Sequence, residues 1–135
     1  MYLDVDASRC TGCRICESFC SLYHEGASWP ERSRIRIRMQ SDDGPFVAAV
    51  CRQCDDAPCA AACPTEAITR DPRTAAMRVD PDLCTFCGAC WDACPYDAIC
   101  HDDDRQVSTI CDLCGGQPLC VPNCPKDVIR IMGSI

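Results

Sequence analysis

The clearest alternation of apolar and polar positions lies in the segment RSRIRIRM, where Arg34, Arg36 and Arg38 are separated by isoleucines. A period of two predicts a β-strand with one apolar face and one basic face. The basic face is open to two interpretations. It is either an ordinary solvated surface or a docking edge, since it concentrates positive charge on an acidic protein.

Short apolar runs broken by turn residues predict two β-hairpins and a terminal strand. Residues 67–80, AITRDPRTAAMRVD, indicate a hairpin that turns at its Asp-Pro pair. Residues 98–110 indicate a second hairpin, with three aspartates, 102–104, at its tip. The final segment VIRIMGSI predicts an edge strand.

Cysteine dominates the composition, with 17 among 135 residues. That share exceeds the roughly 8–10% typical of a fold that depends on cysteine chemistry. Only three Phe, three Tyr and two Trp are available for a core. Because such an apolar interior would be thin, another kind of interaction has to hold the fold together.

Sixteen of the cysteines form four similar motifs along the chain. Each motif begins C-x2-C and ends x3-C, and the middle spacing is two, four, two and five residues in turn. All but the first motif end in Cys-Pro, followed by a short apolar step that ends in Ile. The motifs are Cys10, Cys13, Cys16, Cys20; Cys51, Cys54, Cys59, Cys63; Cys84, Cys87, Cys90, Cys94; and Cys111, Cys114, Cys120, Cys124.

The motif also predicts local structure. We expect its first three cysteines to lie in a loop, because their thiolates converge on one object. The x3-C-Pro part fits a short helical turn that carries the last cysteine away, and the Ile that follows begins a strand. In the first motif Ser21 replaces the proline after Cys20, so a different geometry is expected there.

The third motif, C-x2-C-x2-C-x3-C-P, matches the bacterial ferredoxin run, whose last cysteine binds a second cluster. Motifs therefore act in pairs, and sixteen thiolates provide the iron ligands of four 4Fe–4S clusters. Zinc and disulfides are the alternatives. Neither requires the third cysteine at this spacing or the Cys-Pro ending, and no secretory signal precedes the motifs.

Charge and missing motifs exclude other classes of function. The net charge of −7 argues against nucleic-acid binding, and no apolar run approaches the ~18–20 residues of a membrane span. No glycine-rich dinucleotide loop or Walker loop is present, and His24 and His101 are too scattered to suggest a zinc or Rieske site. The remaining cysteine, Cys100, is expected to be a buried free thiol.

The four motifs together resemble the four-cluster ferredoxin-like electron-transfer subunits of molybdenum and tungsten oxidoreductases, of the dimethyl sulfoxide reductase iron–sulfur type. The opening RCTGCRICESFCSLYHEGASWPERSRIRI is most similar to the short subunits that accompany tungsten aldehyde oxidoreductases or carbon monoxide dehydrogenases. The resemblance implies an α+β fold of short helices and hairpins, built from two nested ferredoxin-like modules with two 4Fe–4S clusters each. Residues 1–135 would form one domain, with an inner module at 51–99 and an outer module from 1–50 and 100–135.

The resemblance also implies which cysteines share a cluster. The last cysteine of each motif completes the cluster of another motif, the first pairing with the fourth and the second with the third. The four ligand sets would be Cys10, Cys13, Cys16 and Cys124; Cys111, Cys114, Cys120 and Cys20; Cys51, Cys54, Cys59 and Cys94; and Cys84, Cys87, Cys90 and Cys63.

The expected function is that of a cytoplasmic, non-catalytic relay of single electrons. Its partners would be a tungsten or molybdenum catalytic subunit acting on an aldehyde, and a flavin or NAD-binding subunit or a soluble acceptor. Alternatives are a free polyferredoxin shuttle, a ferredoxin subunit linked to carbon monoxide dehydrogenase, and a cluster-based redox sensor or assembly scaffold. End-to-end self-association is a further expectation, since the resemblance implies a linear row of clusters.

Overall fold

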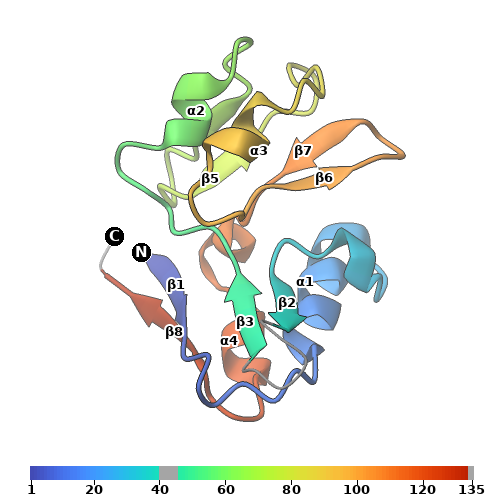
Figure 1. Ribbon diagram of the computed structural model, residues 1–135, viewed down its shortest axis with the longest axis vertical. Helices are drawn as coiled ribbons and strands as arrows, with labels where there is room; N and C mark the ends of the chain where they lie inside the picture. The colour runs from blue at the N-terminus through green and yellow to red at the C-terminus, as the bar shows by residue number, and fades with distance from the viewer. Residues whose placement is uncertain (40–45, 134–135) are drawn as a thin grey trace.

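The computed structural model describes residues 1–39 and 46–133 (Figure 1). Within these residues, short strands form two-stranded antiparallel sheets, β1–β8, β2–β3, β4–β5 and β6–β7. The strands are β1 (Tyr2–Val5), β2 (Arg36–Met39), β3 (Phe46–Ala49), β4 (Ile68–Arg70), β5 (Met77–Val79), β6 (Cys100–Asp102), β7 (Val107–Thr109) and β8 (Ile129–Met132). The helices are α1 (Ile15–Glu25), α2 (Pro58–Ala62), α3 (Ala89–Ala93) and α4 (Cys120–Asn123), with 3-10 turns η1 (Pro30–Arg32) and η2 (Leu113–Gly116). This is the small α+β fold of short helices and hairpins that the sequence predicts.

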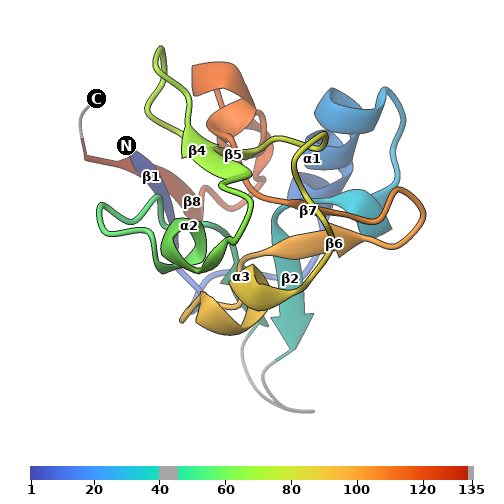
Figure 2. The same ribbon diagram turned by 90° about the horizontal axis from the view of Figure 1, so that it is seen from above.

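The elements gather toward two ends of the molecule. At one end α1 packs against α4, beside the sheets β1–β8 and β2–β3; at the other α2 packs against α3, beside β4–β5 and β6–β7 (Figure 1). The first and last strands lie side by side in both views (Figures 1 and 2), with Tyr2 opposite Met132 and Val5 opposite Ile129. The beginning and the end of the described chain therefore belong to the same end of the fold.

The first predicted hairpin is confirmed. Strands β4 and β5 pair in antiparallel register, with Ile68 opposite Val79. The turn is closed by the Ala75 N–H, which donates to the carbonyl oxygen of Asp71 at 2.8 Å. The Asp-Pro signal therefore located this turn correctly.

The second hairpin is confirmed with one correction, which concerns Asp102. This residue ends β6 instead of lying at the tip, and only 8% of it is exposed. Its carboxylate accepts hydrogen bonds from the backbone N–H groups of Asp104 and Arg105 and lies 3.4 Å from the Arg32 guanidinium. An aspartate that closes a turn in this way is held inward by its partners, whereas the sequence pattern shows only three acidic residues in a row.

The predicted terminal strand is also present as β8. It covers Ile129–Met132, and the last two residues of VIRIMGSI lie outside the described part of the chain. Its partner β1 alternates Leu3 and Val5 with Asp4, but so short a pattern did not lead to the prediction of a strand. The prediction therefore includes β8 but not the strand it pairs with.

The second half of the alternating arginine segment, Arg36–Met39, forms β2. Ile37 in the strand and Ile35 just before it are 4% and 2% exposed, as the pattern predicts. The basic side chains, however, have partners within the chain. Arg34 donates to the Ile110 carbonyl at 3.1 Å, Arg36 donates to a backbone carbonyl at 3.0 Å, and Arg38 forms an ion pair with an aspartate. Each arginine of this face therefore has a partner within the chain, and docking of another protein on it stays a prediction.

The apolar core is small, as the composition predicts. The largest fully buried apolar side chains are those of Leu3, Ile35, Met77, Ile110 and Leu113. Motif cysteines complete the same buried cluster of residues; they include Cys16, Cys20, Cys51, Cys59, Cys90, Cys111 and Cys120. Cysteine side chains therefore contribute to the buried core together with the aliphatic side chains.

Candidate metal centres

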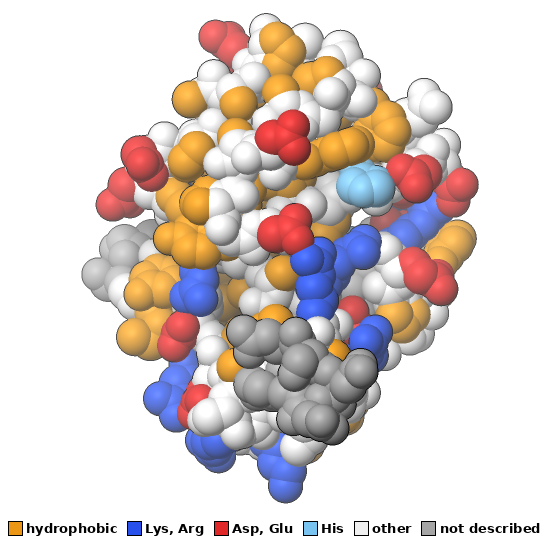
Figure 3. Space-filling model, viewed as in Figure 1, with side chains coloured by type: hydrophobic (Ala, Val, Ile, Leu, Met, Phe, Trp, Pro, Cys, Tyr) orange, Lys and Arg blue, Asp and Glu red, His pale blue; other side chains and the backbone are white. Residues whose placement is uncertain are grey.

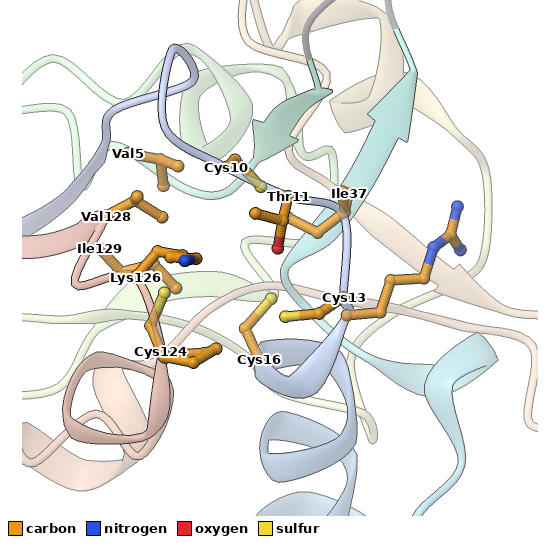
Figure 4. Close-up of a pocket in the computed structure, with 12 residues that line it drawn as sticks. Val5, Cys10, Thr11, Cys13, Cys16, Ile37, Cys124, Lys126, Val128 and Ile129 are labelled. Atoms are coloured by element: carbon orange, nitrogen blue, oxygen red, sulfur yellow. The ribbon is translucent and has the colours of Figure 1, made fainter.

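Three cavities are each lined by four cysteines, three from one motif and the last from another. We call them site A (Cys10, Cys13, Cys16, Cys124), site C (Cys51, Cys54, Cys59, Cys94) and site D (Cys63, Cys84, Cys87, Cys90). In site A the four sulfur atoms point toward a common space from the first loop, α1 and the residue after α4 (Figure 4).

The remaining motif cysteines form a fourth group at the contact of α1 with η2 and α4. We call it site B (Cys20, Cys111, Cys114, Cys120). Burial raises the pKa of Cys111, Cys114 and Cys120, and the nearby Cys20 thiol raises each of them further. The cavities of sites A, C and D, with this fourth group, divide the sixteen motif cysteines into four sets, and the binding of one cluster by each set stays a prediction.

Contacts between elements place neighbouring sites side by side. Helix α1 carries both Cys16 of site A and Cys20 of site B. The Gln53 side chain, in the loop of site C, donates to the Cys111 carbonyl of site B at 2.8 Å, and α2 of site C packs against α3 of site D. The order is A, B, C, D, and the exposed cysteines, Cys13 and Cys87, belong to the two outer sites.

A shared backbone feature shapes the loop of every motif. The second residue after the first cysteine has a positive φ in all four cases: Gly12 at 72°, Gln53 at 52°, Phe86 at 60° and Leu113 at 58°. Left-handed residues turn backbone N–H groups toward an enclosed anion, as in many iron–sulfur sites. In the second motif the Gln53 N–H donates to Cys51 Sγ at 3.3 Å.

Substituting Gly12 is expected to destabilise the protein more than its φ alone would predict. A Cβ atom at Gly12 would lie 2.6 Å from the ring of Phe46, in addition to the strain of a φ of +72°. We expect Gly12→Ala to lower the free energy of unfolding by about 2–4 kcal/mol, adding about 1–2 for the backbone and about 1–2 for overpacking. Denaturant unfolding of loaded protein, followed by visible absorbance and circular dichroism, measures this loss.

Gly26→Ala is the matched control, because Gly26 has a φ of +76° and a Cβ there would meet no atom within 4 Å. Gly26→Ala should lower the free energy of unfolding only by the backbone contribution, about 1–2 kcal/mol. Equal losses in the two variants would show that the contact between Gly12 and Phe46 does not constrain the loop of site A.

The helices begin earlier than the sequence predicts. The third cysteine of each motif lies in the helix itself; these are Cys16 in α1, Cys59 in α2, Cys90 in α3 and Cys120 in α4. The first two cysteines of each motif therefore precede the helix, and Cys114 of the fourth motif lies in the 3-10 turn η2. A helix that starts at the third cysteine or one residue before it fixes the distance to the fourth cysteine, one turn later.

The proline after the fourth cysteine explains why three of these helices are short. Cys63, Cys94 and Cys124 follow the ends of α2, α3 and α4 with φ near −75° and ψ of 116°. A residue before proline is disfavoured in the helical region, so the helix stops there. In the first motif Ser21 stands in place of proline, and α1 continues past Cys20 to Glu25, with a total length of 11 residues. The different geometry expected around Cys20 is confirmed.

Burial controls the chemistry of most of the cysteine thiols. It raises the pKa of Cys16, Cys51 and Cys120 to about 12. These groups keep their protons until a metal displaces them, since the thiolate is the ligand. Cys20 differs because its pKa is lowered: burial opposes this, but hydrogen bonds from His24 and from the Arg34 N–H at 3.2 Å outweigh it.

His24 is a site residue that the sequence interpretation missed. Its Nδ1 lies 2.9 Å from the Cys20 carbonyl oxygen and 3.6 Å from the Cys20 sulfur, and its Nε2 lies 2.9 Å from Asp112 Oδ1. Burial opposes protonation, but the hydrogen bonds to Asp112 and Cys20 raise the pKa of His24 to about 9. The available signal was the spacing of four residues between Cys20 and His24 on a predicted helix.

The donor set fits iron–sulfur clusters better than the alternatives. All 17 cysteines are free thiols, including the buried Cys100, which belongs to none of the four sites. Within residues 1–39 and 46–133, no three His, Cys, Asp or Glu side chains gather closely enough to hold a single metal ion. A 4Fe–4S cube places its ligands at separate iron corners, and the four-cysteine cavities with apolar walls such as Val5 and Ile37 suit that wider arrangement.

Comparison with known families agrees with this donor set. The 4Fe-4S dicluster domain family matches residues 43–133, and a 4Fe-4S binding domain family matches residues 7–23. The expected cofactors are thereby confirmed: the two matches and the 17 cysteines provide for four 4Fe–4S clusters. None of the helices in the described residues is long and apolar enough to span a membrane.

Individual relatives extend the likeness over almost the whole chain. The chain is 44% identical over 135 residues to the polyferredoxin-like subunit of aliphatic sulfonate oxidoreductase from Pyrococcus furiosus, covering 98% of this chain and 78% of that protein. It is 34% identical over 151 residues to the electron transport protein HydN of Escherichia coli, covering 95% and 85%. It is 35% identical over 127 residues to the beta subunit of NADH-dependent phenylglyoxylate dehydrogenase from Aromatoleum evansii, covering 93% of this chain but 28% of that one.

A solved structure shows a similar fold. The active site complex BamBC of benzoyl coenzyme A reductase contains a chain that superposes with a TM-score of 0.56 at 23% identity, covering 95% of this chain and 74% of that one. The cysteine geometry, the family matches and the relatives agree: this chain belongs to the 4Fe-4S dicluster domain family.

Proposed function

We propose that this chain is a non-catalytic electron-transfer subunit of an oxidoreductase. The observation that carries the proposal is the row of sites A to D, with an exposed cysteine, Cys13 or Cys87, at each end. When bound, each 4Fe–4S cluster supplies a centre that gains or loses one electron. Because the row reaches the surface at both ends, an electron can enter at one end and leave at the other.

In this proposal the chain's own residues hold the clusters, space them and exclude water. Each site takes its four cysteines as ligands, so the first motif pairs with the fourth and the second with the third. Residues 51–99 would then form an inner module, and residues 1–50 and 100–135 an outer one, within a single domain. The contacts of α1 with α4 and of α2 with α3 support this nested organisation.

The catalytic partner is proposed from the relatives and from the family resemblance. The relative in Pyrococcus furiosus is named a subunit of an oxidoreductase, and HydN is named an electron transport protein. We propose a tungsten or molybdenum catalytic subunit acting on an aldehyde or a similar small substrate, with a flavin or NAD-binding subunit or a soluble acceptor at the other end. We further propose a reducing compartment, the cytoplasm, because the motif cysteines ligate iron only as thiolates and no cysteine of the described residues is in a disulfide.

Native purification under anaerobic conditions tests this proposal. A stable complex with an oxidoreductase chain, holding tungsten or molybdenum and about 16 irons per copy of this subunit, is the expected result. A monomer with the same iron content and no partner would favour the free shuttle. Loss of clusters coupled to a change in gene expression would favour the redox sensor.

Charge at the two ends of the row supports the further proposal that copies associate end to end. The exposed Arg14 and Lys126 line site A, whereas the exposed Asp82 and Asp92 lie within two residues of site D cysteines in the sequence. Figure 3 shows several basic side chains toward the lower end, where α4 and the first loop lie. Opposite charge at the two ends favours head-to-tail contact.

Association of this kind should depend strongly on salt. The Debye length falls from about 10 Å at 0.1 M to about 3 Å at 1 M, so we expect larger species at low salt and monomers at high salt. Sedimentation velocity of loaded protein measures this, and Arg14→Glu should weaken association at low salt. Arg105→Glu is a control, because Arg105 is an exposed arginine paired with Glu25 on another part of the surface. A monomer at every concentration and ionic strength would contradict the proposal.

A further inference from the structure

Ser108 lines site D although it belongs to none of the four cysteine motifs. It lies in β7 and is only 4% exposed. Its backbone N–H donates to Cys84 Sγ at 3.4 Å, and its hydroxyl oxygen lies 3.5 Å from Cys90 Sγ. One residue therefore reaches two of the four sulfur atoms of the same site.

The direction of the hydroxyl hydrogen bond follows from its neighbours. The Trp91 indole N–H donates to Ser108 Oγ at 2.9 Å, and an indole nitrogen can only donate. A cysteine that ligates iron is a thiolate without a proton. The Ser108 hydroxyl therefore accepts from Trp91 and donates its own proton toward Cys90.

The indole that orients this hydroxyl is itself held in place. The Trp91 ring packs edge-on against Phe86, with centroids 5.3 Å apart, and lies tilted against His101 at 4.5 Å. Aromatic contacts of this kind favour the observed orientation of the ring. The packing of the ring thus directs the indole N–H toward Ser108 Oγ.

A hydrogen bond donated to a ligand sulfur stabilises the more negative, reduced state more than the oxidised state. Hydrogen bonds to sulfur are among the factors that set cluster potentials. We propose that Ser108 is a positioning residue that raises the midpoint potential of the cluster at site D. This rests on the proposed assignment of Cys63, Cys84, Cys87 and Cys90 to one cluster.

The proposal separates one site from the other three. Ser108 contacts sulfur atoms of site D alone among the hydrogen bonds of the described chain. Replacing Ser108 should therefore change the midpoint potential of one cluster and leave the midpoint potentials of the other three unchanged. A general loosening of the fold would instead move several midpoints or reduce the iron content.

The test is a redox titration monitored by electron paramagnetic resonance on the intact loaded protein, under anaerobic conditions. In Ser108→Ala the backbone N–H to Cys84 stays and the hydroxyl is lost. We expect one of four midpoints to shift to lower potential, with iron content unchanged. Ser108→Thr keeps the hydroxyl and should restore the original value, and Ser28→Ala, at an exposed serine, should change nothing.

Four unchanged midpoints in fully loaded Ser108→Ala, or a common shift of all four, would overturn the proposal. If that variant loses iron, Trp91→Phe decides, because it keeps the Ser108 hydroxyl but removes the N–H that orients it. A smaller shift of one midpoint in the same direction supports the proposal, and no shift refutes it. An unmodified protein with fewer than four titrating centres would count against the proposed function instead.

Discussion

Removing the iron from the loaded protein is expected to unfold most of the chain. The strands are three or four residues long, and α2, α3 and α4 have only four or five residues. Isolated elements of this size are not stable in water. Metal–thiolate binding contributes on the order of 10 kcal/mol or more in small structural sites, comparable with the ~5–15 kcal/mol stability of a whole domain. Far-ultraviolet circular dichroism and amide hydrogen exchange of chelated, anaerobic protein measure the loss.

Two controls separate this effect from damage to the protein. Cys100→Ala should keep its clusters and its folded spectrum, because Cys100 is outside the four sites. Restoring iron and sulfide to the chelated protein should recover the spectrum. A metal-free protein with native-like dichroism and protected amides would show that the small apolar core suffices alone.

The sequence predicted the elements whose signals are local. The Asp-Pro turn located the β4–β5 hairpin, and the missing proline after Cys20 predicted a different geometry in the first motif. Both features act within a few residues of chain, so their effect is visible in the order of residues. The alternating segment at β2 was predicted for the same reason.

Elements and partners that depend on distant residues were not predicted. Strand β1 exists because it pairs with β8 at the other end of the sequence, and β3 because it pairs with β2. The engagement of Arg34 with Ile110 likewise joins residues 76 positions apart. A period-two pattern reports which side chains are apolar but not which partner a basic side chain finds in the fold.

The candidate sites show the same division. The spacing within each motif identified the iron–sulfur chemistry, but only the family resemblance indicated which motifs share a site. His24 and Ser108 were missed because their roles arise from contacts with Asp112 and with Cys84, Cys90 and Trp91. Of the contacts that these two residues make, only the one between Cys20 and His24 could have been predicted from the sequence, because the two residues are four positions apart on a helix.

The pairing of motifs can be tested by combining substitutions of cysteines. We expect Cys124→Ala and Cys13→Ala each to alter one of four centres, because each removes one ligand. Together they should still alter only one centre, since both line site A. Cys124→Ala with Cys114→Ala should alter two, because Cys114 belongs to site B. Iron analysis and counting of titrating centres by electron paramagnetic resonance measure the outcome.

The two double variants discriminate between the pairings because the alternative predicts the opposite result. If each motif held its own cluster, Cys124 and Cys114 would act on one centre, while Cys124 and Cys13 would act on two. Cys100→Ala provides the baseline of about 16 irons for the loss of a cysteine that is no ligand. The nested arrangement therefore predicts that the losses of iron caused by Cys13→Ala and Cys124→Ala are not additive, although the two residues are 111 positions apart in sequence. Additive losses for that pair would exclude a shared site A, whatever the total iron content.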